Sequence, residues 1–481
     1  EYVFSALVTT SSASTIPFLV KIQTNEAPRL GTCGSSPAVG TGLETNFRLA
    51  CSGWTDDDHP LQYKFQTVRY YGSLPSDRIY SDVCANRFLP TYDTVLPAPA
   101  GSGNDASARL EMRAIIMDDL GAETYSQFFV NVSRPDNLNV EIELSKLRDT
   151  VADGDLQSFT THVLALSADG RISSDQQQNL LQMIASVTLD STSQFETRAK
   201  SINVENSATL VQAVTAILSP ELKDHLSNQA LDILTDVTKI AADRDSYGEN
   251  PRNTLIASGS GLRNLISLHS KEVSTGADFS QGFNPNLAMK ADAVIHSLSR
   301  MMLKDAVIGE DERKLSFPGV KNDSILQVSG RVLKGERVGN TALTHSFTGA
   351  TVSFPEIPNV SGFAQAALSF VSLMNGAIYP TPLNASSAGV AVVEIRDPNT
   401  NNKIPVRGLE DPIRYTLPVS QNQSHTEMLL REGWNFSAVF WTGNEWSTDG
   451  VRFVRLAENR SSVICETTHL TSFSSQMRLN V

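Results

Sequence analysis

The spacing of apolar residues changes twice along the chain, and these two changes restrict the possible folds more than any other feature. Up to about residue 135, short runs of β-branched and aromatic residues alternate with Gly, Pro, Asp and Ser, which is typical of strands. From there to about residue 312, apolar residues recur every three or four positions, which indicates helices. The strand pattern then returns. The sequence therefore predicts a multidomain α+β chain in the order β, α, β.

The length of the chain supports a division into several domains, because 481 residues exceed what one hydrophobic core normally serves. The first β region has the strand spacing of an immunoglobulin-like or fibronectin type III-like β-sandwich, and the last region predicts a second, larger β-sandwich. We expect four segments: the tail of a preceding β module, the first sandwich, a helical block and the second sandwich, at residues 1–26, 27–135, 136–312 and 313–481.

Individual helices follow from apolar stripes and from residues that begin or end a helix. A stripe from Leu210 to Leu218 ends before Pro220, and further stripes cover residues 226–240 and 287–303. Ser174 with Gln177 forms a capping box for a helix that continues to residue 189. We expect five or six helices whose Leu and Met stripes form a core and not a cofactor site.

The charge of the chain excludes some partners. Its formal net charge is −13 and no Lys/Arg cluster interrupts the acidity, which argues against binding to nucleic acid or to an anionic membrane surface. No stretch approaches 18 uncharged apolar residues, and the first residues lack the basic and apolar parts of a signal peptide.

Seven Asn-x-Ser/Thr sequons occur in the chain, and six of them follow residue 320. Such a concentration favours a glycosylated, secreted surface. We therefore expect a piece of an ectodomain whose signal and membrane segments lie outside this sequence. The predicted glycosylation sites are Asn131, Asn322, Asn359, Asn384, Asn422, Asn435 and Asn459.

The four cysteines predict one disulfide. Cys33 and Cys51 lie symmetrically about Gly42, and a hairpin turning there would bring the two side by side in a cross-strand disulfide. Cys84 and Cys465 belong to regions of different character, so we expect both to be free and buried.

The first cysteine region carries a recognisable motif. Residues 31–33 read GTC, residues 43–45 read LET with Phe47 close behind, and residues 51–65 read CSGWTDDDHPLQYKF. This pattern resembles the receptor-for-egg-jelly (REJ) module of polycystin-1-like proteins. Asp56, Asp57 and Asp58 suggest calcium, but no graded ligand spacing follows them. We interpret them as a polar turn and expect no metal and no cofactor.

A second motif lies near the end of the chain. Phe440-Trp441, Trp446 and Gly450 precede residues 465–473, which read CETTHLTSF. This looks like the G-protein-coupled-receptor proteolysis site (GPS) that closes a GAIN, or autoproteolysis-inducing, domain. The resemblance implies that the helical block is GAIN subdomain A and the last sandwich is subdomain B. It also implies the extracellular region of a polycystin-1-like membrane receptor, with an adhesion G-protein-coupled receptor as the alternative.

The motif departs from the common form of the site, which has four cysteines in two disulfides. Ala438, Val451 and Thr467 stand where three of them would be, and only Cys465 remains. The usual disulfides should therefore be absent, and packing must hold the cleavage turn. We expect Trp441, Trp446, Cys465 and Phe473 to support it.

The resemblance implies cleavage of the chain between Leu470 and Thr471, and the residue types suit that chemistry. The Thr471 hydroxyl can attack the Leu470 carbonyl in an N-to-O acyl shift, and water then hydrolyses the ester. His469 is the nearby side chain that titrates in the useful range, so we expect it to be the base. Tethering the reactants contributes up to ~7–11 kcal/mol in favourable cases. The oxyanion donor is not evident from the sequence.

Such a protein reacts once with itself and is not a turnover enzyme. The final strand, from Ser472 onward, should remain bound as a tethered partner after cleavage. An adhesion or structural ectodomain that keeps this fold uncut is the alternative; a hydrolase acting on other molecules is disfavoured, because the other histidines lack partner motifs. The resemblance implies an extracellular protein or glycan ligand and a place on the outer side of the plasma membrane, including a cilium or a sperm or egg surface.

Overall fold

The computed structural model divides into two compact units. One contains Glu1–Val68 and Asp82–Leu138, and the other contains Arg69–Ser81 and Asn139–Val481. The structure describes residues 2–9, 15–22, 24–70, 78–84, 86–98, 108–153, 155–169, 171–189, 204–217, 224–243, 249–274, 285–304, 306–317, 326–345, 348–374, 379, 389–419, 427–428, 430–443, 445–458 and 461–479.

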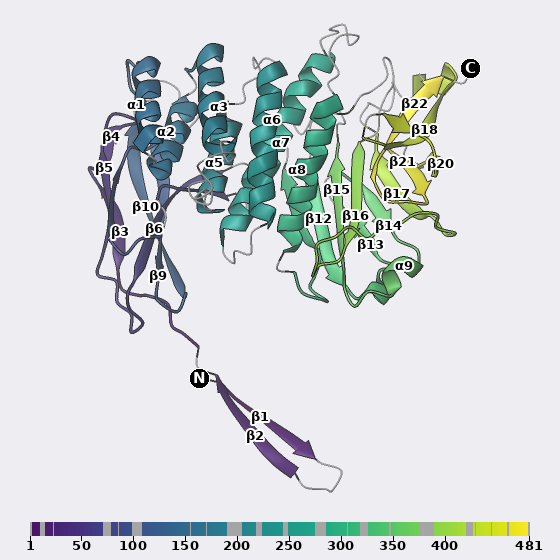
Figure 1. The fold of residues 1–481 in the computed structure, drawn as a ribbon, viewed down its shortest axis with the longest axis horizontal. Helices are drawn as coiled ribbons and strands as arrows, with labels where there is room; N and C mark the ends of the chain where they lie inside the picture. Colours follow the sequence, from purple (N-terminus) through teal and green to yellow (C-terminus); the bar gives the residue numbers. More distant parts are fainter. Residues whose placement is uncertain are drawn as a thin grey trace. The chain divides into compact units, whose positions relative to one another are not determined.

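The first unit consists of antiparallel strands with one parallel addition (Figure 1). A hairpin of β1 (Tyr2–Thr9) and β2 (Thr15–Ile22) comes first. One sheet has the order β3 (Thr32–Ser36), β5 (Phe47–Ser52) and β8 (Thr91–Thr94). The other sheet includes, in order, β4 (Val39–Thr41), β10 (Glu123–Ser133), β9 (Ala108–Met117) and β6 (Gln62–Tyr70). Strand β7 (Arg78–Asp82) follows β6 in the chain, and all of it except Asp82 is assigned to the second unit.

The predicted disulfide is confirmed. Cys33 on β3 lies opposite Cys51 on β5, and their sulfur atoms are bonded. The connection is not the simple hairpin that we expected, because the chain between them forms β4, which pairs in parallel with β10. Glycine at position 42 suits this connection, since an added Cβ would lie 3.2 Å from the Leu96 carbonyl oxygen, which is a tight contact. Cys84 and Cys465 are free and buried, as predicted.

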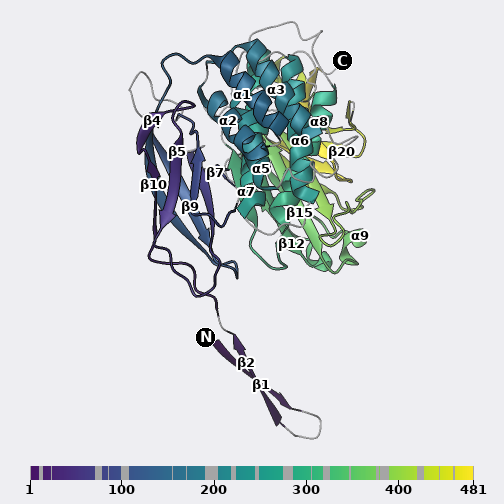
Figure 2. The same cartoon turned by 60° about the vertical axis from the view of Figure 1, so that its left-hand side comes forward.

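The helical block is larger than the sequence indicated, since the described residues contain seven helices before β11 where five or six were expected (Figures 1 and 2). The last of them, α8, packs against strands β12 and β15 of the neighbouring sheet. The helices are α1 (Val140–Asp153), α2 (Leu156–Asp169), α3 (Ser174–Leu189), α5 (Val204–Ile217), α6 (Asp224–Asp243), α7 (Glu249–Ser274) and α8 (Pro285–Leu303).

The predicted capping box was wrong by one residue. Helix α3 begins at Ser174, so Ser173 is the residue that caps it. The Gln176 amide donates to the Ser173 hydroxyl at 3.4 Å, and the Ser173 amide donates to the Gln176 side chain at 3.0 Å. Residues 173–178 read SSDQQQ, so each of the two serines has a glutamine three residues later and the sequence alone could not choose between the two registers.

Two sheets complete the second unit. The seven-stranded sheet has the order β11 (Arg313–Phe317), β12 (Leu326–Leu333), β15 (Ala366–Leu373), β16 (Val390–Arg396), β22 (Ser472–Leu479), β18 (Trp434–Trp441) and β19 (Trp446–Ser447). The five-stranded sheet has the order β13 (Ala342–Thr344), β14 (Thr351–Ser353), β17 (Ile413–Pro418), β21 (Ser462–Thr467) and β20 (Val451–Leu456). Short helices lie at Gly335–Arg337 and Pro358–Ser361.

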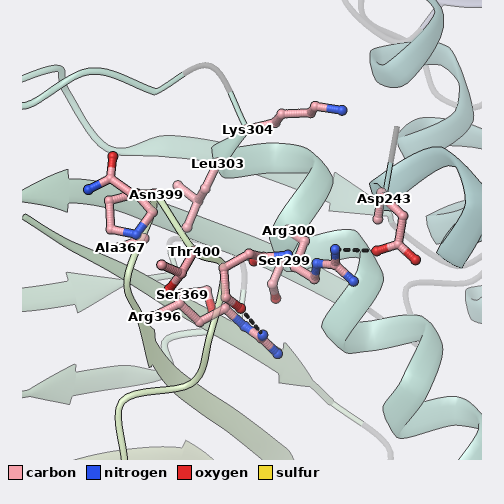
Figure 3. A pocket seen from close by; sticks show the side chains of 13 residues that line it. Asp243, Ser299, Arg300, Leu303, Lys304, Ala367, Ser369, Arg396, Asn399 and Thr400 are labelled. Atoms are coloured by element: carbon pink, nitrogen blue, oxygen red, sulfur yellow. Dashed lines mark hydrogen bonds and ion pairs between the residues drawn. The ribbon is translucent and has the colours of Figure 1, made fainter. Parts of the chain in front are cut away.

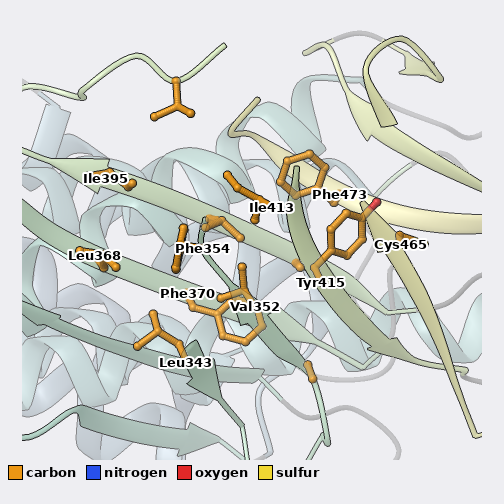
Figure 4. Close-up of a cluster of buried hydrophobic side chains, with 14 of the residues drawn as sticks. Leu343, Val352, Phe354, Leu368, Phe370, Ile395, Ile413, Tyr415, Cys465 and Phe473 are labelled. Carbon is orange, nitrogen blue, oxygen red and sulfur yellow. The ribbon is translucent and has the colours of Figure 1, made fainter. Parts of the chain in front are cut away.

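Side chains from both sheets form one hydrophobic core, which holds the C-terminal strand (Figure 4). Phe473 of β22 is fully buried and stacks on Tyr415 of β17 at a centroid distance of 5.0 Å. Burying a side chain of this size contributes about 1.5–3 kcal/mol. The mixed architecture of helices and sheets is thus confirmed, whereas the immunoglobulin-like, fibronectin-like and sandwich assignments and the four domain boundaries stay predictions.

Candidate functional site

The predicted triplet His469, Leu470 and Thr471 lies in a short turn that joins the two sheets. Strand β21 of one sheet ends at Thr467, and β22 of the other begins at Ser472. Four backbone hydrogen bonds hold the turn. Two are donated by the turn, from Thr468 N–H to the Gly450 carbonyl at 2.9 Å and from Leu470 N–H to the Val406 carbonyl at 3.3 Å. Two are accepted by it, from Leu409 N–H at the Thr468 carbonyl and from Val393 N–H at the Thr471 carbonyl, both at 3.3 Å. The candidate scissile bond is therefore fixed from three directions.

The His469 side chain is half-buried between aromatic rings. The Phe440 ring meets it edge-on at a centroid distance of 4.5 Å, and the Phe473 ring lies at 5.8 Å. Burial and, secondly, the charge of Arg407 lower the pKa of His469. Its imidazole is therefore neutral at neutral pH, and its buried Nε2 has no hydrogen-bond partner among the described residues. A neutral imidazole of this kind can accept a proton.

The Thr467 hydroxyl holds the backbone of His469, although the sequence singled out Thr467 only as a missing cysteine. Its hydroxyl accepts a hydrogen bond from His469 N–H at 3.2 Å and donates to the His469 carbonyl at 2.9 Å. Its Oγ1 also lies 3.5 Å from Nδ1 of the ring. The cross-strand partner of Thr467 is Val451, so two positions of the missing cysteines face each other.

Gly450 gives the turn room. Its φ is +69°, and a Cβ there would lie 2.9 Å from His469 Nδ1 and 2.9 Å from Thr468 Oγ1. A side chain at this position would both strain the backbone and push the imidazole away. Glycine at position 450 of the motif is therefore explained by steric contacts with the cleavage turn.

The Thr471 hydroxyl is half-buried and donates to the Trp441 carbonyl at 3.2 Å. Within the described part of the chain, no hydrogen bond joins this hydroxyl to His469. The structure thus brings the two predicted reactants into one turn but does not bond them. Catalytic contacts are often looser before reaction than during it.

The predicted aromatic supports lie together beside Thr471. The Trp441 and Trp446 rings are 5.4 Å apart, and Tyr379 packs on them at 5.8 and 5.6 Å. Burial raises the pKa of the Cys465 thiol to about 12, which makes it an unreactive core residue. Tyr379 and Asp292, whose carboxylate accepts from Ser472 Oγ at 3.3 Å, were both missed, because neither lies near the motif in sequence.

Comparisons with known protein families place both motifs. The REJ domain family matches residues 1–167, and the GPS family, described as GAIN subdomain B, matches residues 327–480. The chain has a REJ domain followed by GAIN subdomain B. This order is the polycystin-1-like arrangement and suggests an extracellular ectodomain. No curated protein matches the chain. The described helices include none that is both long and apolar enough to cross a membrane.

The sequons can be placed only in part. The side chains of Asn131, in the REJ domain, and of Asn359 and Asn435, in GAIN subdomain B, are exposed. Exposure is what attachment of a glycan requires. The remaining predicted sites lie outside the described residues: Asn322, Asn384, Asn422 and Asn459.

Two further polar features lie apart from the turn. In the REJ domain, carboxylate oxygens of Asp56, Asp58 and Asp118 lie within 4.8 Å of one another, but Asp118 is already held by Asn25 at 2.6 Å. We assign no metal to this cluster.

The other feature is a cavity of about 420 Å³ between α6, α8, β15 and the turn after β16 (Figure 3). Its two guanidinium groups are already paired within the chain. Arg300 pairs with Asp243, and Arg396 donates to the Asn401 carbonyl at 2.9 Å. We therefore assign this cavity no ligand.

Proposed function

We propose that this chain is the extracellular region of a polycystin-1-like membrane receptor, and that it cuts itself once between Leu470 and Thr471. The observation that carries the proposal is the turn itself. In this turn the neutral, half-buried imidazole of His469 lies two residues before Thr471. Both residues belong to the segment that matches GAIN subdomain B. Burial keeps His469 in the proton-accepting form near neutral pH.

The reaction balances without any group from outside except water. The Thr471 hydroxyl leaves the Trp441 carbonyl and gives its proton to His469, while Oγ1 adds to the Leu470 carbonyl carbon. The C–N bond then breaks as the Thr471 nitrogen takes up a proton, which leaves an ester. Water hydrolyses that ester to a Leu470 carboxylate and a free Thr471 hydroxyl. Tethering of the reactants contributes up to ~7–11 kcal/mol.

The turn at residues 468–471 is held by hydrogen bonds although the usual disulfides are absent. The backbone hydrogen bonds described above hold residues 468–471, and the Thr467 hydroxyl binds both the N–H and the carbonyl of His469. These contacts support cleavage in a site that has only Cys465 of the four family cysteines.

Strand β22 should stay in place after cleavage. It pairs with β18 from Phe473 to Leu479 and with β16 at Ser472 and Phe473. Its Phe473 and Met477 side chains are buried in the core. The C-terminal fragment is thus a tethered partner whose removal by a ligand or by force would signal across the membrane. The ligand class that we propose, an extracellular protein or a glycan, is suggested by the resemblance of the domains and not by a particular site.

The test is to express the chain by secretion and analyse it by denaturing electrophoresis and mass spectrometry. The expected products are residues 1–470 and a peptide of residues 471–481. Thr471→Ala should remain intact, because it removes the nucleophile, whereas Thr468→Ala in the same turn should still cut. A wild-type chain that stays intact would contradict the proposal.

A second candidate is an adhesion ectodomain with the same fold that does not cut. The observation in its favour is that the Thr471 hydroxyl donates to the Trp441 carbonyl and not to His469. In that case wild type and Thr471→Ala would give the same single band.

A further inference from the structure

A carboxylate of helix α8 contacts the first residue of the C-terminal strand. Ser472 Oγ donates to Oδ1 of Asp292 at 3.3 Å, and the hydroxyl of Tyr379 donates to the same oxygen. Tyr379 is almost fully buried, and its ring packs on Trp441 and Trp446. Three segments that are distant in sequence therefore meet at one carboxylate oxygen.

This contact lies one residue after the proposed nucleophile. Thr471 is fixed by its carbonyl, which accepts from Val393 N–H of β16, and by its hydroxyl, which donates to the Trp441 carbonyl of β18. Asp292 of helix α8 adds a third hydrogen bond next to the nucleophile, at Ser472, and it is the one that comes from the helical block. Asp292 lies outside the 327–480 match to GAIN subdomain B, so subdomain B by itself lacks this contact.

The surroundings of Asp292 show why its hydrogen bonds matter. Burial raises the pKa of Asp292, while the hydrogen bonds from Tyr379 and Ser472 act in the opposite direction. A carboxylate removed from water is costly unless it is hydrogen-bonded. Loss of one donor therefore leaves the carboxylate undersatisfied, and loss of the carboxylate leaves two buried hydroxyls with a missing acceptor.

From these contacts we infer that Asp292 and Tyr379 are positioning residues, through which helix α8 holds Ser472. By fixing Ser472 they hold the Leu470–Thr471 bond in the cleavage turn and keep the start of β22 in its sheet. Their effect on cutting rests on the proposed function, while their hold on β22 does not. They act through Ser472 and not on the reacting atoms.

The first experiment measures the rate of cleavage after a pulse of synthesis. Asp292→Ala should slow cleavage roughly 10-fold or more, because small misplacements of tethered reactants cost up to about 100-fold. Asp292→Asn should recover most of the rate, since its amide oxygen still accepts both hydrogen bonds. Tyr379→Phe should be intermediate, because it keeps the ring on the two tryptophans and removes one donor.

The matched control is Asp232→Ala. Asp232 lies on α6 and is ion-paired with Lys290 of α8 at 2.6 Å, so this change also perturbs the helix. It should leave cleavage at the wild-type rate. If the control slows cleavage as much as Asp292→Ala, or if Asp292→Asn is no better than Asp292→Ala, the positioning role is overturned.

The second experiment does not depend on cutting. In the Thr471→Ala background, hydrogen exchange is followed at the amides of Ser472 and Phe473. Asp292→Ala and Ser472→Ala should each speed this exchange, and the double variant should show no more than the larger single effect, since the two residues share one contact. Unchanged exchange, or fully additive effects, would overturn the inference even in a chain that cuts normally. A wild-type chain that never cuts would sink only the cleavage proposal.

Discussion

His469 carries the pH dependence of the proposed reaction. Burial and, secondly, the charge of Arg407 lower its pKa below the ordinary value of 6.5. The neutral form is the base, so acid stops the reaction only when the pH falls through the lowered pKa. We expect the midpoint of acid inhibition to lie below pH 6.5. The rate of cleavage of newly folded chain in buffers of different pH measures this midpoint. A midpoint above pH 6.5 would contradict a lowered pKa of His469.

The charge of Arg407 can be tested separately. Arg407→Gln removes the second cause of the shift and should move the midpoint of the same pH series upward, with the rate near neutral pH little changed. Arg337, also exposed, lies in the short helix Gly335–Arg337, and Arg337→Gln is the matched control, which should leave the midpoint in place. Equal shifts in the two variants would show a general effect of net charge.

Thr467 explains how a site with a single cysteine can still orient its base. Its hydroxyl binds the His469 backbone on both sides, so Thr467→Val should slow cleavage about 10-fold, in line with loss of a hydrogen bond worth ~1 kcal/mol or more. Thr467→Ser keeps the hydroxyl and should cut at close to the wild-type rate. Pulse labelling followed by electrophoresis measures the cleavage rate of both variants. Equal rates for Thr467→Val and Thr467→Ser would show that the Thr467 hydroxyl does not assist cleavage.

Residues of the site could be found from the sequence only where they belong to the contiguous motif. His469, Thr471, Trp441 and Trp446 were named in that way. The structure has the first two in the cleavage turn and the two tryptophans on β18 and β19, with the Trp441 carbonyl hydrogen-bonded to Thr471. Asp292 was not, because it lies 180 residues before Ser472 in a helix whose other positions are explained by packing. A single acidic residue in an amphipathic helix carries no signal of the strand that it will contact.

At the scale of elements, strongly periodic segments were predicted well and atypical ones were missed. The stripe at residues 226–240 became α6. Helix α7 lies in the region predicted to be helical but was not named as a separate helix, and Gly259 and Gly261 interrupt its pattern. These two glycines are explained by packing against distant residues, which rules based on local sequence do not consider. A Cβ at Gly259 would lie 2.3 Å from the Phe317 ring, and one at Gly261 would lie 2.8 Å from Thr215 Oγ1. Tertiary contact here overrides helix propensity.

The pairing of β20 with β21 predicts that a disulfide can be introduced at two positions where the common form of the site has cysteines. Val451 and Thr467 are cross-strand partners, and a disulfide between them would close a loop of about 15 residues, which is worth about 3 kcal/mol. Val451→Cys with Thr467→Cys should therefore raise Tm by several degrees. The gain should disappear on reduction and be absent from either single variant. Four free thiols in the denatured double variant, namely Cys84, Cys465 and the two introduced cysteines, would show that the introduced pair does not bond.

For the whole molecule, the main consequence of the fold is that the cut chain should behave as one particle. Strand β22 lies between β16 and β18, and most of its described side chains are buried, so the peptide of residues 471–481 should co-elute with the large fragment in native chromatography and separate only in denaturant. The order of β and α regions could be predicted because periodicity reports burial. The identity of the two strands that flank β22 could not, since strand order depends on contacts between distant segments.

Retention of that strand can be weakened without touching the cleavage turn. Met477 lies on β22 five residues after Ser472 and is 1% exposed, so Met477→Ala should cost about 2–5 kcal/mol of packing. Cleavage should proceed, because the hydrogen bonds of the turn remain, but the peptide of residues 471–481 should dissociate faster during native chromatography. Met428→Ala is the matched control, since Met428 is 46% exposed and lies outside the strand, and it should retain the peptide as wild type does. Equal retention in both variants would show that backbone pairing, and not the buried side chains, holds the fragments together.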